Sequence, residues 1–573
     1  MNWDLSALYE NEAALNQDLE NAKQRAKSFE GVCKGKLKAL HVNEFLEAIR
    51  EYESINETLG RIMTYAFLQF ATDSDKGGFY AKYQNEYTKI AEYLLFFELE
   101  FNTLSKPKQE EFISASSYYR YYLESLMVEK PYQLSQKEER ILLKKDMTSA
   151  SAFSRLFDEH FSRMKFKCEG KMLSEEEILS KLQDPSREVR KNAARAFTKG
   201  LKPHQPLLAY IFNMIKADLA SDCELRGYKN AEQPRHIHNK ISQKSVNALI
   251  KTAENSLHLV QNYYTQKAKL LGLEELFEYD RYAPLPSVQS HYDFEMSKRI
   301  VLEAFEKFNP KFHEIATLAF DEKWIDVMPK DKKRGGAFSH PATPSTHPYV
   351  LLNHTNTRRD LFTLAHELGH AIHQYLSRGV GYLGSDTPLT TSETASVFAE
   401  MLVFDAIKEN LSLEEKRSLY ASKIEDIFST LYRQINFTTF ERLVHAHEGE
   451  VDIASFNRYW MQESKKMFGT SITLSSDYAL WWSYIPHFIH SPFYCYAYSY
   501  GQLLVLALYG LYKKSDKVEF VKNYTHFLSA GGSKSPKELI AAFGFDIEDE
   551  KFWELGIGEI ESILSEFKGM CHD

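Results

Sequence analysis

Two histidines and a glutamate form the pattern HExxH inside the apolar segment TRRDLFTLAHELGHAIHQYLSRG. In a helix, His366 and His370 lie one turn apart on one face, so their imidazoles can bind one tetrahedral ion. Glu367 then lies beside the ion, where its carboxylate can take a proton from a water molecule on the metal. Two satisfied core histidines are the alternative, but polar groups in so apolar a helix are costly without partners. We therefore predict one zinc ion per chain and a hydrolytic centre.

A third ligand is expected from the next helix along the chain. Glu393 and Glu400 share one face of the segment TSETASVFAEML, and Glu393 lies nearer the turn that returns the chain. We predict that Glu393 is the third ligand; Glu400 is either the alternative ligand or the partner that orients a ligating histidine. Thr390 and Glu393 also fit a capping box, which is the structural explanation of the same glutamate. His373 lies about 10.5 Å along the helix from His366, too far to share its ion.

The helix that carries HExxH has recognisable ends. Thr357 and Asp360 have the residue types of a capping box before the apolar run, and Gly379 is a suitable stop after it. The preceding residues 322–353 are rich in Gly, Pro, Ser and Thr, and within them AFS and YVLLN have the character of short strands. We therefore predict a small β-sheet next to a buried HExxH helix.

The remainder of the chain is predicted to be mainly α-helical. Only 25 glycines and 17 prolines occur in 573 residues, and apolar residues recur three and four positions apart over long stretches. The stretch KFKCEGKMLSEEEI alternates before it turns helical, which indicates a short hairpin. Asp184, Pro185 and Ser186 fit the start of a helix and mark a domain boundary. We predict an N-terminal helical domain at 1–183 and a zinc metallopeptidase catalytic domain at 184–573.

Composition disfavours several partners and compartments. Lys+Arg 70 against Asp+Glu 79 gives a net charge of −9 with the two signs interspersed, whereas nucleic-acid binding needs a positive field. The five cysteines are scattered and form no CxxC, which favours a reducing compartment over a disulfide framework. The N-terminus MNWDLSALYENEAALNQDLE lacks the basic and apolar regions of a signal peptide. We predict a cytoplasmic protein that does not bind nucleic acid.

One long uncharged segment raises the alternative of an intramembrane metalloprotease. No Asp, Glu, Lys or Arg occurs from Tyr478 to Tyr512. However, six of the 20 residues in FYCYAYSYGQLLVLALYGLY are tyrosines, which prefer the membrane interface, and Gln502 lies in the middle. We predict a buried helix of a large soluble protein and no membrane partner.

Several motifs together resemble the thimet-oligopeptidase (M3) family, and most closely its oligoendopeptidase F branch. They are TLAHELGHAIHQYLS, a glutamate 23 residues after the second histidine, PHFIHSPFYCYAYSYG, WDLSALY, KRGGAFSHP, GGSKSP and FWELG. These motifs are spread over essentially the whole chain. The resemblance implies a mostly helical, prolate molecule with a deep channel, zinc at the channel floor, and hydrolysis of short peptides rather than folded proteins.

The resemblance also implies a histidine and tyrosines that hold the tetrahedral intermediate by hydrogen bonds to its oxyanion. The candidates are His487 or His490, with Tyr494, Tyr496 and Tyr498. His490, Tyr494 and Tyr498 are four residues apart and could line one face of a helix, whereas His487 stands in the PHF context of the branch. A core or wall aromatic is the structural alternative for each tyrosine. We predict that His487, Tyr494 and Tyr498 are catalytic and that His490 and Tyr496 bind substrate.

Gly335 and Gly336 precede the predicted AFS strand. In the family, such an edge strand pairs with the peptide backbone near zinc, and main-chain pairing tolerates many sequences. An ordinary hairpin bend is the alternative. The prediction for the whole chain is a zinc-dependent endopeptidase for short peptides with Glu367 as general base. A peptide-binding module with a silent metal site is the rival, and the presence of Glu367 disfavours it.

Overall fold

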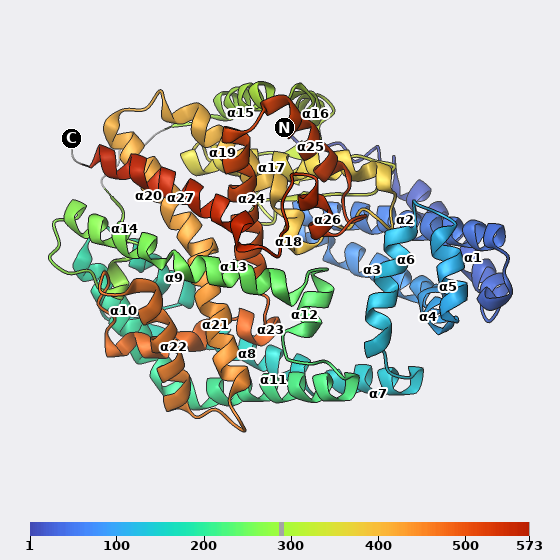
Figure 1. Cartoon of the computed structure of the whole chain (residues 1–573), viewed down its shortest axis with the longest axis horizontal. Coiled ribbons are helices and arrows are strands. Elements are labelled where there is room, and N and C mark those ends of the chain that lie inside the picture. Colours follow the sequence, from blue (N-terminus) through green and yellow to red (C-terminus); the bar gives the residue numbers. More distant parts are fainter. Residues whose placement is uncertain (286–290, 572–573) are drawn as a thin grey trace. The chain divides into compact units, whose positions relative to one another are not determined.

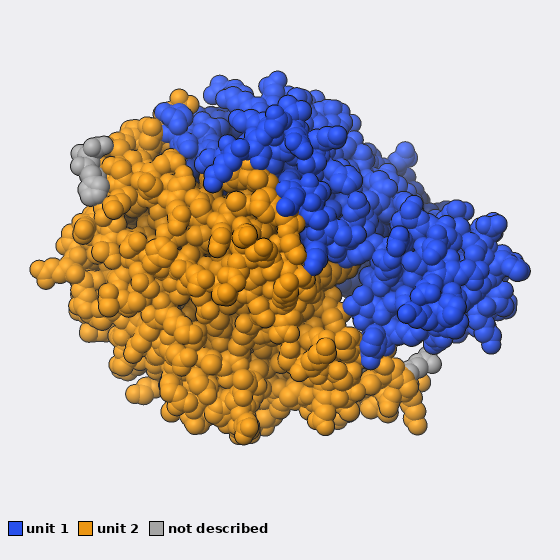
Figure 2. Space-filling model, in the orientation of Figure 1, with its two compact units in different colours: residues 1–131, 289–409, 512–544 blue, residues 132–288, 410–511, 545–573 orange. Residues whose placement is uncertain are grey.

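The computed structural model describes residues 1–285 and 291–571, which form a predominantly helical protein (Figure 1). The predicted mainly α fold class is confirmed. The chain folds into two compact units, each assembled from separate segments of the sequence (Figure 2). Unit 1 contains residues 1–131, 289–409 and 512–544, and unit 2 contains residues 132–288, 410–511 and 545–573. The boundary at residue 184 stays a prediction.

Unit 1 is built on amphipathic helices. In α2, buried residues recur at helical spacing, and Phe45 stacks on Phe112 of α5 with ring centroids 3.9 Å apart. Burial of such a side chain contributes about 1.5–3 kcal/mol. The helices of unit 1 are α1 (Glu12–Cys33), α2 (Val42–Thr72), α3 (Gly77–Ala91), α4 (Phe96–Thr103), α5 (Lys106–Ser114), α6 (Arg120–Glu129), α15 (Phe294–Phe308), α16 (Pro310–Asp321), α17 (Arg358–Leu376), α18 (Leu389–Ser392), α19 (Thr394–Lys408), α25 (Lys517–Ser529) and α26 (Pro536–Ala541).

A three-stranded sheet lies against α17 in the same unit. Its order is β3-β5-β4, and β5 (Tyr349–Leu351) pairs parallel with β3 (Ile325–Asp326) and antiparallel with β4 (Phe338–His340). Both β4 and β5 contact α17. The predicted strands AFS and YVLLN and their place beside the HExxH helix are therefore confirmed. β4 is an edge strand of this sheet.

The close packing of α19 on α17 depends on one glycine. A Cβ atom built on Gly369 would lie 2.6 Å from the carbonyl oxygen of Ala395 and from Cα of Ser396. Any larger residue would push the two helices apart, because both neighbours are backbone atoms. The approach brings the start of α19 next to the histidine-bearing part of α17.

The start of α17 matches the prediction, whereas its end does not. The capping box forms at its start, where Asp360 accepts hydrogen bonds from the backbone and hydroxyl of Thr357 at 2.9 and 2.7 Å. The helix ends at Leu376 and Ser377 is its C-cap, so the predicted stop at Gly379 is wrong. Gly379 lies within a 3₁₀ turn, and Gly381 after this turn has a positive φ of 77°.

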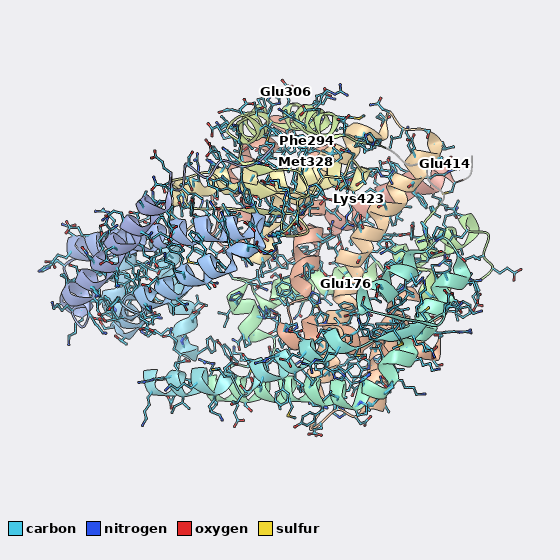
Figure 3. All side chains as sticks on the ribbon, turned by 180° about the vertical axis from the view of Figure 1, so that it is seen from behind. Glu176, Phe294, Glu306, Met328, Glu414 and Lys423 are labelled. Carbon is cyan, nitrogen blue, oxygen red and sulfur yellow. The ribbon has the colours of Figure 1, made fainter. Side chains whose placement is uncertain are left out.

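The segment that leads into α17 is fixed by aromatic packing. Phe294 is the first residue of α15 (Figure 3). Its ring lies 5.6 Å from that of His354 and 6.1 Å from that of Phe320 on α16. All three residues belong to unit 1. The entry to the HExxH helix is thereby anchored to the neighbouring helices α15 and α16.

Unit 2 has a separate aromatic core. Trp482 stacks on Phe456 of α22 with ring centroids 4.3 Å apart, and its indole nitrogen donates to Asn457. The helices of unit 2, with α24 running past its boundary, are α7 (Gln136–Asp146), α8 (Ala150–Arg163), α9 (Glu175–Ser180), α10 (Arg187–Leu201), α11 (Gln205–Arg226), α12 (Gln233–His238), α13 (Gln243–Asn255), α14 (Leu257–Leu270), α20 (Leu413–Thr430), α21 (Tyr432–Ala446), α22 (Ile453–Phe468), α23 (His487–His490), α24 (Tyr496–Lys514) and α27 (Glu550–Met570).

Two smaller predictions for unit 2 are also confirmed. The alternating stretch forms the antiparallel hairpin of β1 (Phe166–Cys168) and β2 (Lys171–Leu173). The apolar run becomes α24, and its residues 503–508 are fully buried. Among the described residues, no helix combines the length and the apolar character needed to cross a bilayer.

Candidate metal centre and candidate polar residues of unit 2

Three predicted ligand atoms converge between α17 and the start of α19. Oε2 of Glu393 lies 3.4 Å from Nε2 of His366 and 3.4 Å from Nε2 of His370. The ligand atoms of the three residues all lie within 4.8 Å of one another. Bonds of about 2.0–2.1 Å to a tetrahedral zinc place neighbouring ligand atoms about 3.3–3.4 Å apart. The residues therefore fit a zinc ion in donor type and in spacing.

The position of Glu393 is set by the junction of α18 and α19. It occupies the N-cap position of α19 but makes no capping hydrogen bond with its side chain. Its carboxylate instead accepts a hydrogen bond of 2.7 Å from the hydroxyl of Ser396 and faces the histidines. The geometry thus favours the ligand explanation of this glutamate over the capping box with Thr390.

Glu400 contacts the other side of His366. Its Oε1 lies 2.7 Å from Nδ1 of the imidazole. A proton on Nδ1 that is donated to Glu400 leaves the lone pair of Nε2 free for a metal. Of the two roles open to Glu400, this geometry matches the orienting one.

The charges of the centre are strongly coupled. Burial alone would lower the pKa of His366, but the hydrogen bond and charge of Glu400 outweigh it and raise that pKa to about 9. Burial alone would raise the pKa of Glu393, but His370 and His366 hold it at about 2. Without metal, a protonated His366 therefore faces the Glu393 carboxylate, and a zinc ion bound at Nε2 would take the place of that proton.

Glu367 lies on the same helix and is 7% exposed. Burial raises the pKa of its carboxyl, and the two neighbouring imidazoles oppose that shift. A carboxyl whose pKa moves from its ordinary range towards neutrality suits general acid–base chemistry. His373, by contrast, is buried outside the ligand group, and burial lowers its pKa to about 4, so it stays neutral.

His490, Tyr494 and Tyr498 could line one helical face by their spacing, but the structure does not place them on one helix. α23 ends at His490 and α24 begins at Tyr496, and Phe493 between them has φ of 57°. Pro492 has no N–H to donate within a helix, and a left-handed residue next to it cannot continue one. His490, Tyr494 and Tyr498 therefore do not share a helical face.

The break in the helix gathers a different set of side chains. The ring of Tyr494 lies 5.0 Å from that of Tyr498, and Nε2 of His487 lies 3.4 Å from the Tyr498 hydroxyl. Burial and the charge of Arg433 lower the pKa of His487, which favours a neutral imidazole. The three residues predicted as catalytic in unit 2 thus form one cluster of hydrogen-bonding groups.

The two residues predicted to bind substrate from this segment have other hydrogen-bond partners. His490 pairs with Asp158 of α8, with 2.8 Å between Nε2 and Oδ1. Tyr496 is fully buried, and its hydroxyl lies 2.9 Å from Nδ1 of His236 and 2.9 Å from Nδ2 of Asn239. Tyr496 therefore has the contacts of a core residue, the structural alternative for these tyrosines.

Gly335 and Gly336 are exposed immediately before β4. Gly336 has φ of 79°, a conformation that favours glycine, and its carbonyl accepts from Asn353 at 2.8 Å. This bend sets the direction in which the edge strand β4 begins. The contacts fit the hairpin bend and leave the strand edge beside the HExxH helix.

Glu441 on α21 is a buried acid that sequence analysis missed. Its Oε1 accepts a hydrogen bond of 2.9 Å from the backbone N–H of Phe493, the residue with the left-handed backbone. Its Oε2 has no hydrogen-bond partner among the described residues. Burial raises the pKa of this carboxyl to about 8. A glutamate within the helix TTFERLVHA gives no sign in the sequence that it holds a distant turn.

Replacing Glu441 with glutamine should stabilise the protein increasingly as pH rises from about 5 to 8. In the folded protein the Glu441 carboxyl stays protonated up to about pH 8, whereas in the unfolded chain it ionises above its ordinary pKa of 4.5. The free energy of unfolding of the wild-type protein therefore falls with rising pH in this range, by at most about 1.4 kcal/mol per pH unit. Glutamine keeps the acceptor for Phe493 and cannot ionise. Thermal denaturation at pH 5, 6.5 and 8 measures the effect, and a difference in Tm that does not change with pH would contradict it.

Comparison with known proteins gives consistent results for sequence and fold. Residues 180–559 match the model of peptidase family M3, and residues 100–166 match the model described as oligopeptidase F. Oligopeptidase PepF of Bacillus subtilis is 29% identical over 99% of this chain and 88% of its own length. An oligoendopeptidase F homolog of Borreliella burgdorferi is 29% identical over 99% of this chain and 97% of its own.

Two solved structures share the fold. A peptidase from Chlamydophila abortus superimposes with a TM-score of 0.89 at 24% identity, over 99% of this chain and 98% of that one. Oligoendopeptidase-F from Enterococcus faecium superimposes with a TM-score of 0.70 at 20% identity, over 97% of each chain. At these identities the structures support the fold, and the sequence relatives support the family.

Proposed function

We infer the function of this chain from the fact that it belongs to peptidase family M3 and is a metallo-endopeptidase. We propose that it hydrolyses short peptides and that one zinc ion is held by His366, His370 and Glu393. The observation that carries this proposal is the convergence of the three ligand atoms, with Glu393 3.4 Å from each histidine. Zinc, when bound, supplies a Lewis acid that polarises the scissile carbonyl and acidifies water.

The protein's own residues move the protons. Glu367 takes a proton from the attacking water and then gives it to the nitrogen of the leaving amine, so that it serves first as base and then as acid. Its buried position and raised pKa support this proposal, because a carboxylate of ordinary, lower pKa would take the proton from water less readily. Glu400 keeps His366 in the tautomer that presents Nε2 to the ion.

His487, Tyr494 and Tyr498 are proposed to donate hydrogen bonds to the oxyanion of the tetrahedral intermediate. Their mutual contacts support a common role. The edge of β4 after Gly336 is proposed to pair with the peptide main chain, which would allow many sequences to be cut. His490 and Tyr496 stay predictions, and the core contacts of Tyr496 favour a structural role.

Replacing Tyr498 with phenylalanine should lower kcat by about 10²–10³ and change KM little. The hydroxyl acts on a charge that exists only in the transition state, and the ring and its packing remain. Steady-state kinetics with zinc content measured in parallel tests this. Tyr496→Phe is the comparison; it should lower Tm and not kcat, because its hydroxyl serves the core. An unchanged kcat in Tyr498→Phe would make this residue a wall aromatic.

The test of the proposed function is cleavage of a mixed peptide library with and without a chelator. We expect peptides to be cut only by the zinc-loaded protein, and folded globular proteins to be cut far more slowly, because the channel implied by the family excludes them. Comparable rates on folded proteins would contradict the size limit. Full activity in the chelated protein would contradict the metal mechanism.

The five free cysteines also support the proposal of a reducing, cytoplasmic environment.

A further inference from the structure

A cavity of about 920 Å³ in unit 1 begins at the proposed metal centre. His370 and Gln374 of α17 form one end of its wall. Gln374 also binds β4, because its side chain accepts from the hydroxyl of Ser339 at 2.7 Å and donates to the Ser339 carbonyl at 3.2 Å. The cavity is therefore lined by a proposed zinc ligand, and it adjoins the strand that is proposed to pair with the peptide.

Aromatic rings form a substantial part of the cavity wall, alongside Thr, Ser and Gln side chains. Phe67 of α2 lines the cavity, with its ring 5.9 Å from that of Tyr80 and 5.5 Å from that of His340. Further apolar lining comes from Met63, Tyr87, Pro341, Ala342 and Tyr382. Flat rings of this kind pack well against aromatic and large aliphatic groups.

Charge is nearly absent from this lining. Burial lowers the pKa of His340 to about 4, so its ring is neutral, and its Nδ1 accepts from the backbone of Ala342 at 3.0 Å. Among the described lining residues, Asp386 is the one carboxylate, and it is exposed. A charged side chain that entered the cavity would lose part of its hydration, and the described lining offers it hydroxyl and amide groups but no buried carboxylate and no Lys or Arg.

Gly60 determines how close Tyr382 lies to α2. A Cβ atom at this position would lie 2.5 Å from the Tyr382 hydroxyl oxygen. The absence of a side chain thus lets the tyrosine lie against the helix and form a wall of the cavity. Met63 lies on the same helix, about one turn from Gly60, and also faces the cavity. Met63 and Tyr382 therefore line neighbouring parts of the cavity wall.

We propose that this cavity is a specificity subsite that accepts an aromatic or large aliphatic side chain of the peptide, with Met63 and Tyr382 setting its size. The inference rests on the proposed peptidase function. Main-chain pairing with β4 would accept many peptide sequences. The cavity would add a preference for an apolar side chain at one fixed position relative to the cleaved bond.

Cleavage of peptides that differ at a single position, carrying Ala, Leu, Phe, Asp or Lys, tests the proposal. At one position we expect kcat/KM for Phe to exceed that for Ala by about 10–100-fold, and Asp and Lys to be no better than Ala. Met63→Trp fills the cavity and should reduce the Phe-to-Ala ratio at least tenfold. Tyr382→Ala widens it and should move the preference towards Trp. Met328→Trp, at an exposed methionine of unit 1 outside the cavity (Figure 3), is the matched control and should leave the ratio unchanged.

A binding assay separates failure of the subsite from failure of the proposed function. Fluorescently labelled Phe and Ala peptides are titrated into zinc-loaded Glu367→Gln protein, alone and combined with Met63→Trp. Tighter binding of the Phe peptide that Met63→Trp abolishes would support the subsite even if no peptide were cut. Identical Phe-to-Ala ratios in Met63→Trp, Tyr382→Ala and Met328→Trp proteins, with zinc retained in each, would overturn it.

Discussion

Replacing Glu367 with glutamine is expected to remove nearly all peptide hydrolysis while zinc stays bound. Glutamine has the same shape but cannot accept the proton of the attacking water or return it to the leaving amine. General acid–base residues contribute roughly 10²–10⁴ in rate, and this one also orients the water. Glu367 is not among the three converging ligand atoms, so the metal should be retained.

The measurement pairs single-turnover cleavage of a fluorogenic peptide with metal analysis and thermal denaturation. Glu306→Gln is the matched control, because Glu306 is an exposed glutamate on α15 of the same unit (Figure 3). The control should keep full activity. Substantial residual turnover in zinc-loaded Glu367→Gln protein would remove this residue from the role of base.

The features of unit 1 that could be predicted are those with local signals. The one-turn spacing of His366 and His370, the capping pair of Thr357 and Asp360, and the strands on either side of a turn-rich loop all depend on neighbours within a few residues. Each of these features is present in the structure. The error at Gly379 is also local, because a 3₁₀ turn follows the helix and contains this glycine.

What could not be predicted depends on residues far apart in the sequence. The apolar pattern around Tyr496 fits a helical wall as well as a core, and only its contacts with His236 and Asn239 distinguish the two. The turn at Phe493 is held by Glu441, 52 residues earlier. Helical periodicity carries no information on such partners, which explains why the break between α23 and α24 was missed.

The assignment of Glu393 combines both kinds of information. In sequence it fits a metal ligand and a capping box equally in residue type, and the close packing at Gly369 is what brings it to the histidines. Glu400 on the same helix is then left to contact Nδ1 of His366 from the other side. The two glutamates have different proposed roles, and the metal content of their variants can distinguish these roles.

Glu393→Ala is expected to lose zinc, whereas Glu400→Gln is expected to keep it with about 10–100-fold weaker affinity. The first change removes one of three ligand atoms, while the second keeps a hydrogen-bond acceptor for His366 but removes its charge. Metal analysis after dialysis and competition with a chromogenic chelator measure both affinities. Because Ser396 donates to Glu393, Ser396→Ala should weaken binding less than Glu393→Ala does. The opposite result would be a wild-type zinc content in Glu393→Ala and a loss of zinc in Glu400→Gln. That result would make Glu400 the third ligand in place of Glu393.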